Sequence, residues 1–295
     1  MLKVLKIAFF MLIYSSITSY SKADGASLIK TLNTSTIREA SKAISISTSI
    51  STSTPTVNPV PREIKSSHAE KLYRRGSDRL KLRKYREAIQ DFTQVLRIYP
   101  KIPEIYLLRG GAYVQLGEYP TAVIDFQEAL KINPKIEKGY YFLGNVNFLQ
   151  QNYPDAILAL NQAIKLNSKD DEAYLLRGKC RFSIQDNQGA ISDFKQVNLL
   201  NPKNAQAYFL SGGVSFKLED YSQAIKELNK ALQFNPNYSD AYLMRAGSRA
   251  LSGDKKGAIR DFEKAVTLFE QEDRITQAQK ARDLLEELKK SLNNL

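Results

Sequence analysis

The side chains that most often carry covalent or metal chemistry are almost missing from this sequence. Its 295 residues include one cysteine, Cys180, and one histidine, His68. A structural zinc site takes several Cys or His ligands, and a nucleophile activated by histidine would have to use His68, which precedes the first predicted helix. We therefore predict no metal, no cofactor and no catalytic residue, and we do not expect an enzyme.

Prolines recur along the chain at a fixed interval. Pro100, Pro134, Pro202 and Pro236 are separated by 34, 68 and 34 residues, and Ser168 stands where the missing one would fall. A period of this length is typical of a helical repeat. With proline at position 32, six repeats are predicted at residues 69–102, 103–136, 137–170, 171–204, 205–238 and 239–272.

Small and large side chains keep their places within each repeat. Position 8 is glycine in the first five repeats, position 20 is alanine in all six, and position 24 is Phe or Leu. Small residues let two amphipathic helices approach closely, and the proline at position 32 ends the second helix. Over residues 69–272 this pattern resembles the tetratricopeptide repeat family. The resemblance implies an all-α solenoid of six helix–turn–helix repeats, wound as a right-handed superhelix, with the first helix of each repeat (helix A) lining a concave groove.

The end of the chain is predicted to close the solenoid. One hairpin cannot bury both of its apolar faces, so the last repeat needs a cover with a polar outer side. Residues 273–295 form an amphipathic pattern, with leucines on one side and charged residues on the other. We predict a C-terminal capping helix over this segment.

Arginine at position 7 and aspartate at position 23 occur together. Repeats 1, 2, 4 and 6 contain both, whereas repeat 3 has Leu143 and Ala159 instead. This joint gain and loss predicts an ion pair between the two helices of each of those four repeats. If partly buried, such a pair costs more to break than it contributes when intact. The predicted pairs are Arg75–Asp91, Arg109–Asp125, Arg177–Asp193 and Arg245–Asp261.

The resemblance also implies that a ligand would lie along positions 2, 5, 9, 12 and 13 of successive A helices. Positions 5 and 12 are apolar or aromatic here and position 9 is small or polar, which favours an apolar peptide or an amphipathic helix of a protein partner. An alternative is that some of the aromatic residues pack on neighbouring helices. The residues predicted to line the groove are Tyr73, Leu107, Tyr141, Asn145, Phe148, Leu175, Lys179, Phe182, Phe209, Phe216 and Leu243.

We therefore expect a non-catalytic scaffold for protein–protein interaction, and two other classes of function are alternatives to it. An RNA-binding helical repeat would need stacking and phosphate-contacting residues in series along the groove, and Lys179 and Lys217 do not form such a series. A hydrolase or transferase acting through carboxylates would need paired acids near an A helix, and the pattern places none there. Cys180 takes a position mostly given to small side chains, so we do not expect a reactive thiol.

The formal net charge of +12 is a further constraint on partners. Residues 1–65 hold eight Lys and Arg and three Asp and Glu, which gives +5, and we interpret the remaining +7 as spread along the repeats. A mildly basic surface aids solubility and weakly favours anionic surfaces. We predict no nucleic-acid partner.

The N-terminus is predicted to be a targeting segment. In residues 1–23, Lys3 and Lys6 precede an apolar run at 7–14, and small residues flank Lys22 at the end of the segment, as in a secretory signal. Residues 24–67 are rich in Ser and Thr and are predicted to be a disordered linker. We expect an exported protein of the periplasm, a lumen or the exterior; an uncleaved membrane anchor and a plastid protein are the alternatives.

Overall fold

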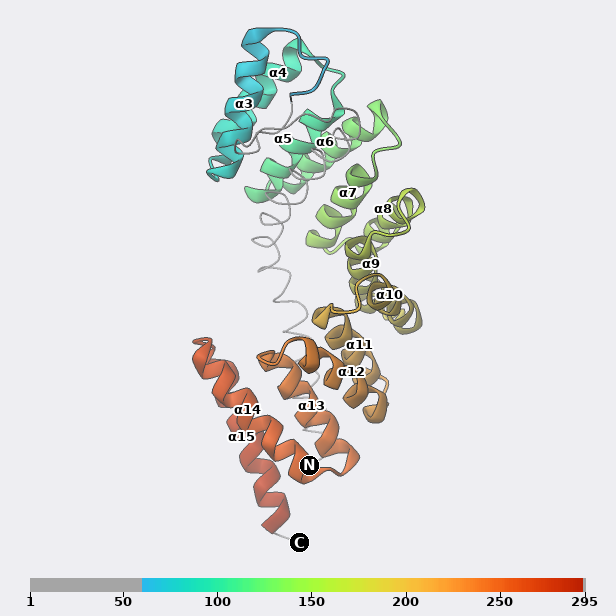
Figure 1. Cartoon of the computed structure of the whole chain (residues 1–295), viewed down its shortest axis with the longest axis vertical. Coiled ribbons are helices and arrows are strands. Elements are labelled where there is room, and N and C mark those ends of the chain that lie inside the picture. Colours follow the sequence, from blue (N-terminus) through green and yellow to red (C-terminus); the bar gives the residue numbers. More distant parts are fainter. Residues whose placement is uncertain (1–59, 294–295) are drawn as a thin grey trace, which may run out of the picture. The chain divides into compact units, whose positions relative to one another are not determined.

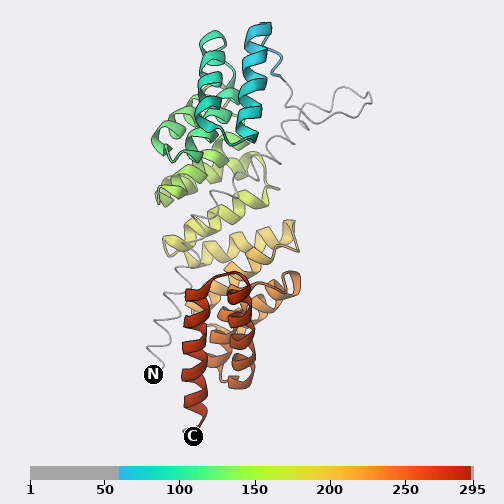
Figure 2. The same ribbon diagram turned by 90° about the vertical axis from the view of Figure 1, so that its left-hand side faces the viewer.

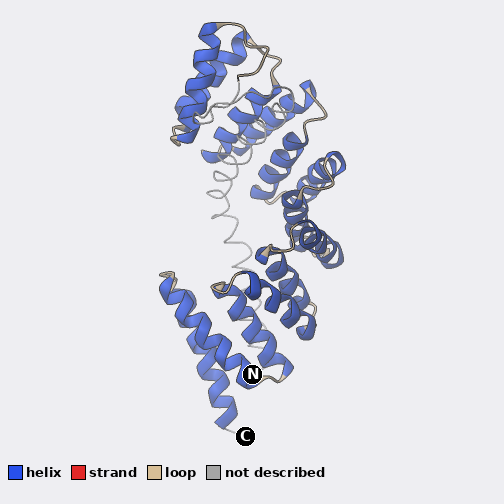
Figure 3. Cartoon of the chain, in the orientation of Figure 1, coloured by secondary structure: helices blue, strands red, loops and turns tan. Residues whose placement is uncertain are grey.

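The computed structural model describes residues 60–293, and this range is all-helical. The predicted signal peptide and the predicted linker up to residue 59 lie outside the described residues. The described range holds 13 helices and no strand (Figure 3). None of these helices is long and apolar enough to cross a membrane. With the labels of Figure 1, the helices are α3 (Ser67–Lys81), α4 (Tyr85–Ile98), α5 (Pro103–Gln115), α6 (Tyr119–Ile132), α7 (Glu137–Leu149), α8 (Tyr153–Leu166), α9 (Asp171–Ser183), α10 (Asn187–Leu200), α11 (Ala205–Lys217), α12 (Tyr221–Phe234), α13 (Ser239–Ser252), α14 (Lys255–Gln271) and α15 (Ile275–Asn293).

The chain divides into two compact units near residue 168. In residues 60–168, α3 to α8 form three hairpins, and each hairpin packs on the next through its neighbouring helices. In residues 169–293, α9 to α14 form three more hairpins in the same way, and α15 packs along α14 (Figures 1 and 2). The six helix pairs match the six predicted repeats, so the predicted all-α repeat fold is confirmed.

Close contact between the two helices of a hairpin explains the small residue at position 8. A Cβ atom on Gly178 would lie 2.6 Å from Cε1 of Phe194, and one on Gly110 would lie 2.7 Å from Cε1 of Phe126. Both phenylalanines stand at position 24 and are fully buried. The glycine therefore makes room for the large side chain that fills the space between the helices.

The turn inside each hairpin uses one left-handed residue, always at position 15. It is Gly117 in repeat 2 and Gly253 in repeat 6, and a non-glycine residue in the other four. The next residue is the N-cap of the second helix, and in repeats 4 to 6 its aspartate side chain accepts a hydrogen bond from the backbone N–H three residues later. This N-cap contact satisfies one of the free donors at the start of each helix. The non-glycine residues at position 15 are Arg83, Gln151, Gln185 and Glu219.

The C-terminal helix joins α14 through a copy of the same turn. Asp273 is left-handed, with φ 55°, and Arg274 N–H donates to the carbonyl of Phe269 at 2.8 Å. In the turn of repeat 2, Glu118 N–H donates to the carbonyl of Tyr113 in the same pattern. Helix α14 is thus the second helix of repeat 6 and the first helix of a terminal hairpin. Buried leucines of α15 complete the core of this unit.

The first repeat begins earlier than the sequence pattern suggested. Helix α3 starts at Ser67, and Ser66 caps it by accepting from Ala69 N–H. Ile64 is buried in the core of repeat 1, and the hydroxyl of Tyr99 accepts hydrogen bonds from the backbone N–H groups of Lys65 (3.2 Å) and Ser66 (3.0 Å). The predicted linker is therefore too long at this end: residues 60–67 belong to the folded unit. One buried isoleucine within a Ser/Thr-rich stretch was too weak a signal to show it.

Candidate functional site

The predicted ion pairs between helices A and B are confirmed in all four repeats. In each, Nη2 of the arginine lies close to Oδ1 of the aspartate sixteen residues later. The four aspartates are buried; Arg109, Arg177 and Arg245 are partly buried, and the Arg75 side chain is 55% exposed. The distances are 2.6 Å for Arg75–Asp91, 2.7 Å for Arg109–Asp125, 2.6 Å for Arg177–Asp193 and 2.6 Å for Arg245–Asp261.

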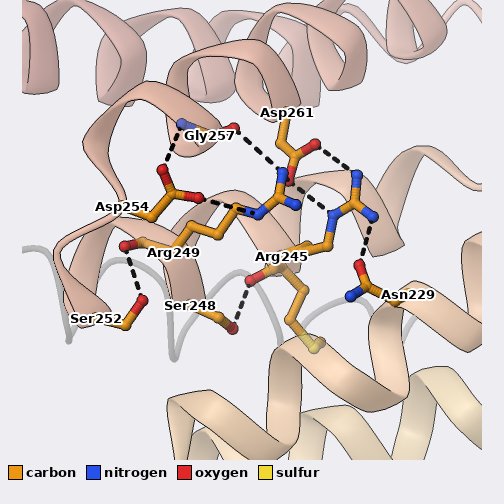
Figure 4. A network of polar contacts seen from close by, with 9 residues as sticks. Asn229, Arg245, Ser248, Arg249, Ser252, Asp254, Gly257 and Asp261 are labelled. Carbon is orange, nitrogen blue, oxygen red and sulfur yellow. Dashed lines mark hydrogen bonds and ion pairs between the residues drawn. The ribbon is translucent and has the colours of Figure 1, made fainter.

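A second arginine shares the aspartate in repeats 1, 4 and 6. In repeat 6, Arg249 Nη1 donates to Oδ2 of Asp261 at 2.7 Å, while Arg245 holds both oxygens of the same carboxylate (Figure 4). Arg249 also donates to the carbonyl of Gly257 and pairs with Asp254 at 3.5 Å. The equivalent arginines at position 11 are Arg79 and Arg181. We missed this contact at the sequence level, although position 11 is arginine in three of the four repeats that carry the pair.

The arginine at position 7 also reaches the preceding repeat. Arg109 Nη1 donates to Thr93 Oγ1 at 3.1 Å, and Arg245 Nη1 donates to Asn229 Oδ1 at 2.7 Å. Burial alone would lower the pKa of Arg109, but the hydrogen bonds and charge of Asp125 outweigh it and raise that pKa. These side chains hold hairpins together and to each other. The helix-B aspartates of four repeats are thereby occupied by structural contacts.

Most of the residues predicted to line the groove are covered by other parts of the fold. Phe209, for example, packs against Tyr238 with 4.8 Å between ring centroids, and Phe182 lies under Lys217, whose Nζ is 4.7 Å from the ring centroid. Burial lowers the pKa of Lys217. The groove residues that are buried are Tyr73, Leu107, Lys179, Phe182, Phe209, Phe216 and Leu243. A partner could touch little of these side chains without movement of their neighbours.

Repeat 3 differs from the other five in this respect. Its residues at positions 5, 9 and 12 are all half-buried, whereas every other repeat buries at least two of the three. Tyr141, Asn145 and Phe148 stand on one face of α7, since they are four and three residues apart. We call these three residues the α7 face. Leu175, in the other unit, is also half-buried.

The α7 face combines apolar surface with one polar group. Phe148 lies 5.8 Å from the ring centroid of Tyr153, and Tyr141 lies 5.9 Å from that of Phe142, so both rings are held in place by aromatic neighbours. Helix α5 packs beside α7. The amide of Asn145 makes no hydrogen bond to any residue from 60 to 293, and such an amide can donate and accept at once along a peptide backbone.

The thiol of Cys180 is buried. Burial raises the pKa of this thiol to about 12, with smaller effects of neighbouring groups. A thiol with so high a pKa is almost entirely protonated at neutral pH and is a poor nucleophile. Cys180 therefore belongs to the packing of α9.

The fold and this arrangement define a helical-repeat protein built from paired antiparallel helices, and comparisons with known proteins agree. The family model of the tetratricopeptide repeat matches residues 73–135 and 214–273. The model of subunit 3 of the anaphase-promoting complex matches residues 150–231. The chain is a member of the tetratricopeptide repeat family, a class of protein-interaction scaffolds. A search of the curated proteins gave no match.

Several solved structures have the same fold. MamA is 25% identical, with a TM-score of 0.54 over 58% of this chain and 94% of that one. The C-terminal part of a tetratricopeptide repeat protein from Cytophaga hutchinsonii is 20% identical, with a TM-score of 0.61 over 74% of this chain and 88% of that one. YrrB is 18% identical, with a TM-score of 0.55 over 65% and 97%.

Proposed function

We propose that this protein is a non-catalytic scaffold, exported from the cytoplasm, that binds an apolar peptide or amphipathic helix of a protein partner along its A helices. The partner contacts the α7 face. One observation carries this proposal: repeat 3 alone among the six repeats leaves the residues at positions 5, 9 and 12 all partly exposed. The solved structure of YrrB, described as a tetratricopeptide repeat protein with an unusual peptide-binding site, gives a precedent within the fold.

The chemistry of the α7 face suits an apolar peptide segment whose backbone N–H and C=O groups are available for hydrogen bonds. Phe148 and Tyr141 offer ring surface, which gains most when it is covered by another apolar surface. Asn145 lies between them along the helix and can fix the register of a bound peptide through its amide. Repeat 3 also has Leu143 and Ala159 in place of the arginine–aspartate pair, so this hairpin carries less charge than repeats 1, 2, 4 and 6.

Peptide selection tests the site. Peptides selected on the wild-type protein from a random displayed library would be measured by fluorescence anisotropy against Asn145→Ala and Phe148→Ser. We expect each substitution to weaken binding by about tenfold or more, because central contacts dominate such interfaces. Leu158→Ser is the matched control, since Leu158 is 63% exposed on α8 of the same repeat. Equal binding by all four proteins would place the contact elsewhere.

Export is tested separately. If residues 1–23 are a cleaved signal, the mature protein begins at Asp24, and intact-mass measurement of the protein purified from its native host detects that start. A chain that retains residue 1 and fractionates with membranes supports the anchored alternative. A chain that retains residue 1 and remains in the cytoplasm contradicts export without affecting the α7 face.

A further inference from the structure

The positive charge of the repeats is concentrated in the first one. Residues 69–102 hold ten Lys and Arg against four Asp and Glu, a net +6, so the rest of residues 66–295 carries only +1. The expectation that the charge is spread along the repeats is therefore wrong. It rested on the total alone, and a count repeat by repeat shows the difference.

The turn between α3 and α4, the two helices labelled in Figure 1, holds four of the exposed cations of repeat 1. Within six residues of chain it carries Lys81, Arg83, Lys84 and Arg86, all exposed. Lys81 pairs with Asp78 at 2.9 Å, but Lys84 is 4.0 Å from Glu87, at the limit of an ion pair. Arg83 and Arg86 have no ion-pair partner among residues 60–293. The turn thus presents positive charge that the described fold does not neutralise.

A leucine stands in the middle of these cations. Leu82 is 67% exposed, among the most exposed large apolar side chains of the described chain. It follows the last residue of α3, and its neighbour Arg83 is left-handed with φ 59°, so the chain reverses directly after it. A protruding leucine surrounded by cations is the arrangement of an interfacial membrane contact, in which the apolar side chain enters the bilayer and the cations meet lipid headgroups.

We propose that the α3–α4 turn docks on a bilayer that contains anionic phospholipids. Leu82 enters the boundary between headgroups and acyl chains, and the basic side chains on either side of it contact lipid phosphates. A bilayer fits this surface better than an acidic protein does. A protein would need a pocket that matches Leu82, whereas a deformable lipid surface accepts one exposed leucine without such a pocket. It fits better than RNA, because an exposed aliphatic tip gains nothing among phosphates and riboses. The proposal does not depend on the α7 face.

Repeat 5 contains a matched turn with the opposite charge. Leu218 stands at the same repeat position as Leu82 and is 45% exposed, and Glu219 is left-handed with φ 62°. The residues that follow this leucine are Glu219 and Asp220, where repeat 1 has Arg83 and Lys84. The turns of repeats 1 and 5 therefore share their backbone geometry but differ in charge, which makes Leu218 the control for Leu82.

Vesicle flotation with the full chain tests the proposal. Binding would be compared on vesicles of phosphatidylcholine alone and on vesicles with about 30% phosphatidylglycerol, so that any charge-independent contribution of the N-terminal apolar run appears on both. The variants are Leu82→Asp and the triple variant Arg83→Asn, Lys84→Gln, Arg86→Gln, in which Asn tolerates the left-handed conformation. We expect about fivefold loss of anionic-vesicle affinity for each charge removed, hence about 100-fold for the triple variant. Leu82→Asp should also lose binding, and Leu218→Asp should bind like the wild type.

Several results would overturn this assignment. Equal binding to the two kinds of vesicle, or equal loss in Leu82→Asp and Leu218→Asp, would show that the basic turn is not the contact. Unchanged anionic-vesicle affinity in the triple variant would do the same. Turn-dependent binding to RNA or to polyglutamate, with none to vesicles, would assign the turn to a different partner. Circular dichroism of each variant would establish that it is folded.

Discussion

Nη2 of Arg109 lies 2.7 Å from Oδ1 of Asp125, and this contact joins α5 to α6 across sixteen residues of sequence. Nε of the same arginine donates to the other carboxylate oxygen at 2.9 Å. The aspartate side chain is 4% exposed, so water has little access to its charge, and this guanidinium balances most of that charge. The two residues act as a unit, and the consequence of removing one differs from that of removing both.

The substitution Asp125→Ala should strongly destabilise the unit of residues 60–168. It leaves Arg109 partly buried without its carboxylate, and breaking such a pair costs about 3 kcal/mol. The double substitution Arg109→Leu with Asp125→Ala copies the Leu143 and Ala159 of repeat 3 and should recover most of that loss. Urea unfolding followed by circular dichroism measures both. A double variant no more stable than Asp125→Ala alone would show that the arginine's bond to Thr93, and not the pair, dominates.

The pairs illustrate what the sequence could establish. Helix positions, turns and the register between helices followed from the 34-residue period, because each repeat must use the same contacts to stack on the next. The ion pairs followed too, since both partners lie within one repeat and vary together. Contacts within a hairpin can therefore be predicted from a single sequence.

The solvent exposure of the groove side chains could not be predicted in the same way. The repeat position placed Phe182 and Phe209 on the correct helices. Whether each side chain is exposed to solvent, however, depends on which side chains of neighbouring elements pack against it. Lys217 from the next repeat covers Phe182, and Tyr238 covers Phe209. Neither Lys217 nor Tyr238 stands at a repeat position where the family pattern specifies the side chain. The α7 face was hidden among the other groove residues for the same reason.

Asn198 marks a weak point in helix α10. Its Oδ1 atom is buried and has no hydrogen-bond partner among the described residues, at a position where the other five repeats have Leu, Ile or Val. A buried acceptor without a donor costs about 1–3 kcal/mol. Asn198→Leu should therefore raise the free energy of unfolding by about 1 kcal/mol. Thermal melts of the two proteins measure the change, and a lower melting temperature in the variant would mean that the amide has an ordered water as its partner.

Left-handed residues inside the hairpin turns offer a second route to stability. Gln185 has φ 68° and an exposed side chain, so its side chain contributes little while its backbone is strained. Gln185→Gly should stabilise the protein by about 0.5–1 kcal/mol, because glycine adopts this conformation without steric cost. The reverse change, Gly117→Ala, should destabilise by a similar amount, since a Cβ there meets nothing within 4 Å and only the backbone is affected. Changes of the same sign in both variants would contradict this explanation.

The stability of the protein should depend on Cys180 at high pH. Burial raises the pKa of its thiol from an ordinary value of 9.0 to about 12. The folded state thus holds this proton more tightly than the unfolded state does. The stabilisation is complete below pH 9 and is lost as the pH rises towards 12, at up to about 1.4 kcal/mol per pH unit.

Comparison with Cys180→Ala isolates this effect, because alanine occupies the same position in repeat 2, at Ala112. Tyr73, whose pKa burial raises to about 12, titrates in both proteins and cancels in their difference. The stability advantage of the wild type over the variant should shrink as the pH rises above 9. A thiol reagent at neutral pH should label Cys180 rapidly in urea and only slowly in the native protein. A pH-independent difference, or rapid native labelling, would show that the thiol reaches solvent and that α9 packs more loosely than its contacts indicate.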